Sequence, residues 1–495
     1  MFNKKEKAGA DVKLEEIVKN YSFNLIKGDL TIEITGIEND SRKIQKGNLF
    51  IAEKGFTVDG HNYIDKAIEN GALAVVVEKE IDVKEDITVI KVEDTIDAMA
   101  KFSGVFHNEP WNNINMIGIT GTNGKTSTTY FIKSILNEGN IKVGIIGTIG
   151  AIVGDKQLAL ENTTPNALVI HDLLLKMANI ETDTCIMEVS SHSLELKRVN
   201  YMDFQVGIFT NLTKDHLDYH ETMEKYFNSK LKLFYKTSKY NIINIDDDYG
   251  MKIVKIVKKR IPLLTYGIRN KADIFATDIK FSLSKVSFKL NTPKGCTQVL
   301  LNIPGEFSVY NALAAASCAY AYDIDLDTIK KGLEAVEGVK GRFEVVPTNT
   351  DYTVIIDFAH TADGLEKVLT VIDQFAEGRK IVVFGAGGNR DRTKRPEMGE
   401  TVGRHADISI VTSDNPRFED PETIIEDILV GTKKANGEYV KIVDRLEAIK
   451  YALDNARPKD IILLAGKGHE AYTIINGKTI PFDERQIVLD HLKKI

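Results

Sequence analysis

A glycine-rich loop between an apolar run and a helix constrains this chain more than any other feature. Residues 114–119 form an apolar run that predicts a buried strand, and residues 126–136 predict a helix. Between them lies Thr120-Gly-Thr-Asn-Gly-Lys125. The backbone N–H groups of such a loop converge on one spot, where the helix dipole also favours negative charge. The pattern therefore indicates an α/β sheet that binds a phosphate group.

The residue types in the loop suit a nucleotide. Gly121 and Gly124 let the backbone approach a phosphate, Lys125 can reach the β- and γ-phosphates, and the Thr126 hydroxyl can bind Mg²⁺. Ile119 stands where the strict phosphate-loop pattern has glycine. The flanking strand and helix favour a phosphate site over a glycine turn with a solvated lysine. The predicted ATP-binding stretch is Gly121, Thr122, Asn123, Gly124, Lys125, Thr126 and Ser127.

Length and composition exclude several classes of protein. At 495 residues the chain is expected to form two to four domains. A net charge of −7 without a polybasic block argues against nucleic acid as a partner, and no apolar run approaches the ~20 residues of a membrane span. The first 14 residues lack a signal-peptide core. We therefore expect a cytoplasmic protein whose three scattered cysteines are buried thiols.

Residues 1–111 predict a first α/β unit. Apolar stretches at 49–52 and 72–77 predict strands, with a helix at 65–70. The polar clusters Asn39-Asp-Ser-Arg42 and Gly55-Phe-Thr-Val-Asp-Gly60 by themselves indicate only surface turns.

Residues 112–343 predict a second unit built on a parallel sheet. Two predicted strands, 185–189 and 205–209, end in Ser190-Ser-His192 and in the polar stretch 211–218. Polar side chains at the carboxyl ends of parallel strands are typical of ligand sites.

A helix predicted at 221–236 carries an unusual lysine. Lys230 falls on the apolar stripe of this helix. An inward lysine costs free energy unless it has a partner or loses its charge, and the alternative is a lysine that extends to water. The other members of the stripe are Met223, Tyr226, Phe227 and Phe234.

Residues 344–495 predict a second parallel sheet whose strands all end in polar residues, which would form one shared crevice. The predicted strands are 352–357, 380–384, 407–412 and 460–465. Their endings are Asp357-Phe-Ala-His360, Gly385-Ala-Gly-Gly-Asn-Arg-Asp391, Ser413-Asp-Asn-Pro-Arg417 and Gly466-Lys-Gly-His-Glu470.

These motifs together resemble the Mur ligase family, within it the UDP-N-acetylmuramoyl-tripeptide synthetases, from Asp40-Ser-Arg42 to Gly466-Lys-Gly-His-Glu470. The resemblance implies a three-domain α/β fold. Residues 1–111 would form a small UDP-substrate-binding domain, 112–343 a central ATP-binding domain with the phosphate loop and a parallel sheet, and 344–495 a Rossmann-like amino-acid-binding domain.

The resemblance also implies roles for individual residues. The UDP-muramoyl-peptide would contact Ser41, Thr57, Asn162, Thr163, Thr164, Ser190 and Arg198. Asn311 and Arg342 would contact the nucleotide. The Mg²⁺ ligands would be Thr126, Glu188, His216 and Lys230, the last as a carbamate formed with CO₂. The chain departs from the family pattern at Ser308, where asparagine is usual, and at Ala362, where proline often stands.

The implied reaction joins a carboxylate to an amine. A carboxylate oxygen is a poor leaving group, so ATP first converts the D-glutamate of UDP-N-acetylmuramoyl-L-alanyl-D-glutamate to an acyl phosphate, and the amine then displaces phosphate. Lys125 and Mg²⁺ would neutralise the two anions that must meet. Asp357 and His360 are both candidates to assist the loss of the amine proton.

The turn at Arg417 indicates which amine is added. Proline fixes the turn, and a guanidinium can bind a distal carboxylate through two hydrogen bonds, while Glu470 can accept hydrogen bonds from a distal ammonium. In the resembling enzymes Asp-Asn-Pro-Arg marks those that add meso-diaminopimelate in peptidoglycan precursor synthesis. L-lysine and lanthionine remain alternatives. The predicted amino-acid site is Arg390, Asp414, Asn415, Pro416, Arg417, Gly466 and Glu470.

Three other functions are weighed against this ligase. The first unit, with Asp40-Ser-Arg42, argues against a folylpolyglutamate synthetase. The presence of Lys125, Glu188 and Lys230 argues against a non-catalytic regulatory protein, and no Asn-Lys-x-Asp motif supports a GTPase. We expect a monomer that binds small molecules.

Overall fold

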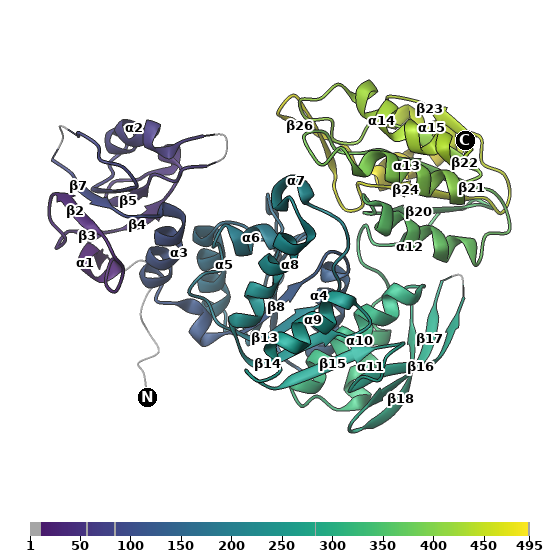
Figure 1. Ribbon diagram of the computed structural model, residues 1–495, viewed down its shortest axis with the longest axis horizontal. Coiled ribbons are helices and arrows are strands. Elements are labelled where there is room, and N and C mark those ends of the chain that lie inside the picture. The colour runs from purple at the N-terminus through teal and green to yellow at the C-terminus, as the bar shows by residue number, and fades with distance from the viewer. Residues whose placement is uncertain (1–10, 56–57, 84–85, 283, 494–495) are drawn as a thin grey trace. The chain divides into compact units, whose positions relative to one another are not determined.

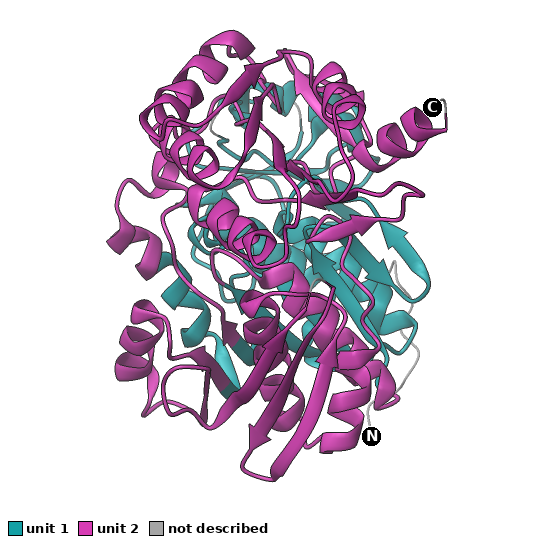
Figure 2. Ribbon diagram, turned by 90° about the vertical axis from the view of Figure 1, so that its right-hand side faces the viewer, with its two compact units in different colours: residues 1–120, 141–207, 229–240 teal, residues 121–140, 208–228, 241–495 magenta. Residues whose placement is uncertain are grey.

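The computed structural model describes residues 11–55, 58–83, 86–282 and 284–493, in which strands and helices alternate (Figure 1). The chain divides into two compact units, coloured separately in Figure 2. Unit 1 holds the described residues up to 120 together with 141–207 and 229–240, and unit 2 holds 121–140, 208–228 and the described residues from 241 onward. Among the described residues, no helix combines the length and apolar character that crossing a bilayer requires.

The N-terminal part of unit 1 is a five-stranded sheet. Its strand order is β2 (Asn24–Lys27), β7 (Thr88–Lys91), β6 (Ala74–Val77), β5 (Asn48–Ile51) and β4 (Gly36–Glu38). The strands β4 to β7 pair in parallel, and β2 pairs antiparallel to β7. Alternate residues of β5 and β6 enter two separate apolar cores that also contain α2 (Ile64–Glu69) and α3 (Thr95–Phe106). The strands and helix predicted here are confirmed.

A sheet of eleven strands contains the strand before the phosphate loop. Its strand order is β11 (Lys156–Leu158), β10 (Gly150–Val153), β9 (Val143–Gly147), β12 (Thr184–Glu188), β8 (Asn115–Thr120), β13 (Phe204–Phe209), β14 (Thr237–Asn244), β15 (Leu263–Gly267), β16 (Ile274–Phe281), β17 (Val286–Thr292) and β18 (Gly295–Leu301). The pairs β9–β12, β12–β8, β14–β15 and β15–β16 are parallel, as predicted. The antiparallel hairpins at both ends were not predicted.

The helices that accompany this sheet follow its strands in the sequence. They include α4 (Lys125–Glu138), α5 (Ala167–Asn179), α6 (Ser191–Glu195), α7 (Leu217–His220), α8 (Met223–Leu231), α9 (Asp248–Val257), α10 (Glu306–Ala321) and α11 (Leu326–Glu334). Residues 221–236, predicted as one helix, form α8 followed by a 3₁₀ turn (Lys232–Tyr235). Lys230 on α8 is only 1% exposed, so the alternative of a lysine that extends to water is wrong.

The C-terminal sheet, within unit 2, has six strands. Their order is β19 (Glu344–Val346), β20 (Thr353–Asp357), β24 (Ile461–Ala465), β21 (Lys380–Phe384), β22 (Ile408–Val411) and β23 (Tyr439–Lys441). All but β19 pair in parallel, which confirms the four predicted strands and their parallel sheet. The helices are α12 (Ala362–Asp373), α13 (Lys394–His405), α14 (Pro421–Lys434), α15 (Arg445–Asp454) and α16 (Glu484–Leu492), and β25 (Tyr472–Ile475) with β26 (Lys478–Pro481) form a hairpin.

The cysteines follow the expected burial in two cases. Cys185 on β12 and Cys318 on α10 are buried, whereas Cys296 is exposed. Cys296 lies near the start of β18, where this last strand of the sheet is exposed. The prediction of three buried thiols is wrong at this position.

A buried histidine in unit 1 should make stability depend on pH. His171 Nδ1 lies 2.6 Å from Ser103 Oγ, which itself donates to the Met99 carbonyl, so Nδ1 carries the proton. Nε2 is buried without a hydrogen-bond partner, and burial lowers the pKa of His171 to about 3. The unfolded chain, with a histidine pKa of about 6.5, binds this proton more readily, so acid destabilises the fold.

We predict that this histidine removes about 1.4 kcal/mol of unfolding free energy for each pH unit between about 6 and 4. In His171→Gln the slope of unfolding free energy against pH should be shallower over that window. Urea denaturation at a series of pH values measures it, and parallel curves for the two proteins would contradict the assignment.

Candidate active site

The phosphate loop of unit 2 is held by the residues that follow β13. The backbone N–H groups of Thr122 and Asn123 donate to the O and Oδ1 atoms of Asn211 at 2.8 and 3.0 Å. The Thr210 hydroxyl donates to the Asn123 carbonyl at 2.6 Å. Gly124 is the N-cap of α4 and provides no capping side chain, so no side-chain oxygen takes the capping position at this helix N-terminus. The N-terminus of α4 therefore suits a phosphate group.

Two positions in this loop require glycine. Gly121 and Gly124 have φ angles of +150° and +87°. A Cβ at Gly121 would lie 1.8 Å from Thr210 Oγ1, and a Cβ at Gly124 would lie 2.4 Å from Asn311 Oδ1. The Lys125 ammonium donates to the Gly121 and Thr122 carbonyls at 2.9 and 3.0 Å, so it lies over the loop.

Two residues outside the loop, Asn311 and Arg342, were predicted to contact the nucleotide, and both contact the N-terminal residues of α4. Asn311 on α10 lies beside Gly124, with its Oδ1 3.5 Å from Thr128 Oγ1. Arg342 Nη2 donates to Thr126 Oγ1 at 3.2 Å, and the guanidinium lies 4.4 Å from the centre of the Phe358 ring. A basic group thus lies at the helix N-terminus.

The predicted metal ligands divide between the units. Glu188 and Lys230 belong to unit 1, and Thr126 and His216 belong to unit 2. Glu188 is 1% exposed, and its two carboxylate oxygens accept hydrogen bonds from the backbone N–H and the hydroxyl of Thr148. Carboxylate and hydroxyl oxygens are the donors that Mg²⁺ prefers. No group of three or more His, Cys, Asp or Glu side chains suited to a metal occurs among the described residues.

Thr164 joins several residues predicted to bind the muramoyl-peptide in unit 1. Its hydroxyl donates to the Glu188 carbonyl at 2.7 Å and accepts from the Ser190 backbone N–H at 3.0 Å. Arg198 Nη1 donates to the Thr164 carbonyl at 2.7 Å. Thr163 lies with its hydroxyl 3.1 Å from that of Thr148. These polar groups therefore surround the carboxyl end of β12.

The remaining residues predicted to bind the UDP-muramoyl-peptide are Ser41, Asn162 and Thr57. Ser41 is buried, and its carbonyl accepts a hydrogen bond from Asn70 Nδ2 at 2.8 Å. Asn162 is exposed. Thr57 lies outside the described residues.

The two candidates for proton transfer differ in their surroundings. Both carboxylate oxygens of Asp357 accept backbone N–H groups, from Phe343 at 2.6 Å and Ala359 at 2.7 Å, and burial raises the pKa of this acid. His360 Nδ1 lies 2.8 Å from the Phe358 carbonyl, so the neutral ring donates from Nδ1 and keeps its lone pair on Nε2. Burial and the nearby positive charge of Lys394 lower the pKa of His360, although 35% of its side chain is exposed.

The predicted amino-acid site lies at the carboxyl ends of the C-terminal strands in unit 2. Arg417 has a φ of +56°, and its Nη1 donates to the Gly388 carbonyl at 2.9 Å. Burial and the nearby Arg390 charge lower the pKa of Arg417. Two neighbouring guanidinium groups suit a carboxylate ligand. Asn415 Nδ2 donates to Glu470 Oε2 at 2.9 Å, and burial raises the pKa of Glu470. The other predicted residues here, Asp414, Pro416 and Gly466, are buried.

Family models match three segments of this chain. They describe the Mur ligase family catalytic domain at residues 33–107, the Mur ligase middle domain at 119–319 and the Mur ligase glutamate ligase domain at 341–468. The UDP-N-acetylmuramoyl-L-alanyl-D-glutamate–2,6-diaminopimelate ligase of Caldanaerobacter subterraneus subsp. tengcongensis is 49% identical over 97% of this chain and 99% of its own length. The chain belongs to the Mur ligase family. The ligase of the same name from Clostridioides difficile is 46% identical over 98% of this Mur ligase and 100% of its own length.

Solved structures agree with this assignment. A structure of a UDP-N-acetylmuramoyl-L-alanyl-D-glutamate–2,6-diaminopimelate ligase aligns with a TM-score of 0.69 and 31% identity over 98% of this Mur ligase and 99% of that chain. MurF from Acinetobacter baumannii aligns over 98% and 99% of the two chains with a TM-score of 0.70 at 20% identity, which shows the fold alone. The predicted three-domain α/β fold is confirmed, with mixed sheets. The boundaries at 111 and 343 stay a prediction.

Several polar residues of this Mur ligase lie in the site although the sequence did not single them out. Asp215 lies 3.4 Å from His216 Nε2, 3.9 Å from His360 Nε2 and 3.7 Å from Lys394 Nζ. Asp363 on α12 accepts from Asn123 Nδ2 at 2.8 Å. Asp215 falls inside the polar stretch 211–218, so its position in that stretch was the available signal.

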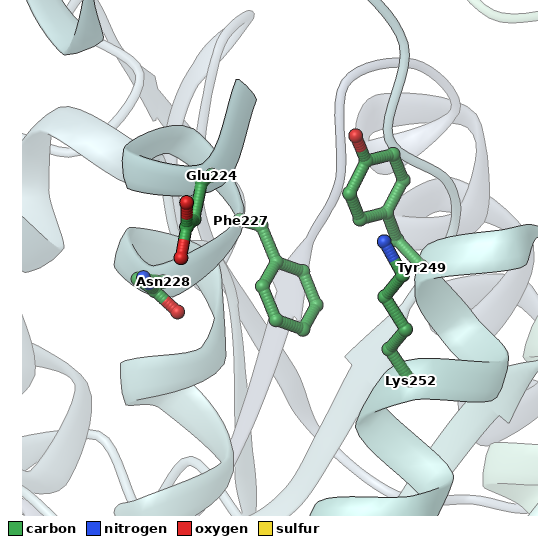
Figure 3. Close-up of a pocket in the computed structure, with 5 residues that line it drawn as sticks. All are labelled: Glu224, Phe227, Asn228, Tyr249 and Lys252. Atoms are coloured by element: carbon green, nitrogen blue, oxygen red, sulfur yellow. The ribbon is translucent and has the colours of Figure 1, made fainter. Parts of the chain in front are cut away.

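Unit 2 also contains a hollow of about 290 Å³. Figure 3 shows it between α8 and α9, lined by Glu224, Phe227, Asn228, Tyr249 and Lys252. Of these, Phe227 belongs to the apolar stripe of α8, and its ring lies 5.4 Å from that of Tyr249. None of the five is a predicted site residue.

We predict that Lys125→Ala lowers ATP-dependent phosphate release by at least about 100-fold, because the ammonium would no longer stabilise charge on the transferred phosphoryl group. Steady-state phosphate release measures this loss. Lys133→Ala, on the same helix, is the matched control and should retain activity. Near-normal turnover in Lys125→Ala, with an unchanged melting temperature, would contradict the assignment of the loop.

Proposed function

We propose that this Mur ligase uses ATP to join meso-2,6-diaminopimelate to the D-glutamate of UDP-N-acetylmuramoyl-L-alanyl-D-glutamate, in peptidoglycan precursor synthesis. The observation that carries the proposal is the turn that fixes Arg417 beside Arg390 and Glu470. This arrangement suits a distal carboxylate and a distal ammonium together. Relatives of nearly full length that are 46–49% identical bear the name of this ligase, which supports the same assignment.

Two anions must meet for the first step. A carboxylate oxygen of the D-glutamate attacks the γ-phosphorus of ATP, ADP leaves, and an acyl phosphate forms. Lys125 and the backbone N–H groups at the start of α4 hold the phosphates and stabilise the charge that develops on them. Bound Mg²⁺ supplies further charge neutralisation. The residues that would hold it are Thr126, Glu188, His216 and Lys230 as its carbamate.

The second step requires a neutral amine. The amine nitrogen attacks the acyl carbon, and phosphate leaves with the bridging oxygen. Of the two candidates, the Nε2 lone pair of His360 suits acceptance of the amine proton, because the lowered pKa keeps this ring neutral near pH 7. Both Asp357 oxygens hold backbone N–H groups, which favours a positioning role for that acid.

The other ligands follow from the same proposal. Ser41 and Thr57 would hold the UDP group, and the residues around Thr164 the muramoyl-peptide. Asn311 and Arg342 would contact the nucleotide. The enzyme would act in the cytoplasm as a monomer, without a nucleic-acid or membrane partner.

Lys230 should carry a carbamate. A buried ammonium is costly, and reaction of the neutral amine with CO₂ converts it to an anion with two oxygen donors. Protein equilibrated with ¹³CO₂ should give a carbamate carbon signal in ¹³C NMR that Lys230→Ala lacks and that Lys225→Ala, changed at an exposed lysine on the same helix, retains.

Activity offers an independent test of the carbamate. Lys230→Ala should be nearly inactive and partly restored by short carboxylates. Full activity in this variant, or an identical NMR signal without Lys230, would overturn the proposal.

Amine-dependent phosphate release with meso-diaminopimelate, L-lysine and lanthionine tests the amino acid. We expect strong preference for meso-diaminopimelate over L-lysine, and a loss of this preference by at least about tenfold in Arg417→Ala. Arg404→Ala, which changes an exposed arginine on α13, is the control. A wild-type enzyme that prefers L-lysine would overturn the proposal. Unchanged preference in Arg417→Ala would show that this arginine does not recognise the distal end.

A further inference from the structure

Lys467 is a buried cation directly behind the Arg417 turn. Only 1% of its side chain is exposed. Its Nζ donates to the Tyr472 carbonyl at 2.9 Å and to Asn415 Oδ1 at 3.2 Å, and pairs with Asp414 Oδ1 at 3.2 Å. Burying an ammonium is costly unless it is paired and hydrogen-bonded, so these three acceptors account for its presence. Two of them belong to the predicted amino-acid site.

The contact with Asn415 determines how that amide is oriented. Asn415 Oδ1 accepts from Lys467 Nζ and from the Ile474 backbone N–H, the latter at 2.9 Å. Both neighbours are donors, so the carbonyl end of the amide must face them. The Nδ2 end therefore donates to Glu470 Oε2 at 2.9 Å. A reversed amide would place its NH₂ group against the ammonium, so Lys467 fixes Glu470 through Asn415.

The same lysine joins the turn to the hairpin of β25 and β26. Lys467 donates to the carbonyl of Tyr472, which belongs to β25. Further hydrogen bonds join the same strand to the turn. The Arg417 N–H donates to the Ile474 carbonyl at 3.0 Å, and the Thr473 hydroxyl donates to the Asp414 carbonyl at 2.7 Å. Arg417 keeps its left-handed φ within this frame. Lys467 is therefore linked to both groups that would recognise the distal end of the amino acid.

We infer that Lys467 is a positioning residue that sets specificity for an amino acid with a second ammonium–carboxylate end. It acts through Asn415 on Glu470 and through β25 on Arg417, without touching the substrate itself. The inference rests on the proposed function. Loss of Lys467 should therefore weaken use of the two-ended amino acid while leaving the phosphate loop and the muramoyl-peptide residues unaffected.

Lys467→Met tests this inference, because it keeps the length and removes the charge and the hydrogen bonds. KM and kcat are measured separately for ATP, the UDP-muramoyl-dipeptide and meso-diaminopimelate. KM for meso-diaminopimelate should rise on the order of tenfold, its preference over L-lysine should fall, and KM for the other two substrates should change less than about twofold. Lys478→Met, the same substitution at an exposed position of the hairpin, should match wild type.

An unchanged KM and an unchanged preference in folded Lys467→Met would overturn the inference, as would equal changes in KM for all three substrates. If this variant does not fold, Lys467→Arg decides, because it keeps the buried charge beside Asp414 but replaces the Nζ donor to Asn415 and Tyr472 by a larger guanidinium. A rise of about threefold or more in KM for meso-diaminopimelate alone then supports the inference, and no change refutes it. Absence of diaminopimelate-dependent phosphate release in wild type would instead refute the proposed function.

Discussion

Repulsion between two anions is the constraint on which this molecule depends. A carboxylate and a triphosphate must come within bonding distance, and neither approaches the other without fixed positive charge. In the proposed function that charge comes from the loop between β8 and α4, through the backbone N–H groups at the start of α4, the helix dipole and Lys125. The shape of this loop depends in turn on Gly121, Gly124 and the residues after β13 that hold it. The sheets bring further polar groups to strand ends, where loops can present them.

Buried charge recurs in several of the stretches that were predicted to bind ligands. Lys230, Lys467 and Asp215 are all nearly inaccessible, and each belongs to a stretch predicted to bind a ligand. In the dense interior a charge is fixed by the few partners that compensate it, so its geometry is well defined. Lys467 illustrates this, since its three acceptors leave the amide of Asn415 one favourable orientation.

Local patterns in the sequence predicted much of the fold. The strand β21 (Lys380–Phe384) was predicted to the residue because it is a continuous apolar run bounded by charged and glycine residues. The stripe on α8 predicted that Lys230 faces inward, and its burial confirms this. The hairpin of β16 and β17 was missed although β17 alternates between buried and partly exposed residues, as half-buried strands do. The sequence between the two strands contains no glycine, proline or asparagine that would indicate a tight turn.

Partners distant in sequence could not be predicted. Asn123 and Asp363 are 240 residues apart, and Lys467 and Asn415 are 52 apart, so no local periodicity links them. The family resemblance predicted that Asn415 and Glu470 bind the amino acid, but only the structure shows that Lys467 contacts Asn415 and that Asn415 contacts Glu470. The roles of Glu188, His216 and Lys230 toward a metal, and the domain boundaries, stay predictions.

The transfer of a carboxylate oxygen to phosphate tests the central claim most directly. The UDP-muramoyl-dipeptide, labelled with ¹⁸O in the side-chain carboxylate of its D-glutamate, is converted with ATP and meso-diaminopimelate, and the released phosphate is analysed by mass spectrometry. If the carboxylate attacks ATP and the amine then displaces phosphate, each phosphate carries one ¹⁸O atom. Phosphate without the label would mean that water, not the carboxylate, receives the phosphoryl group, and would contradict the account.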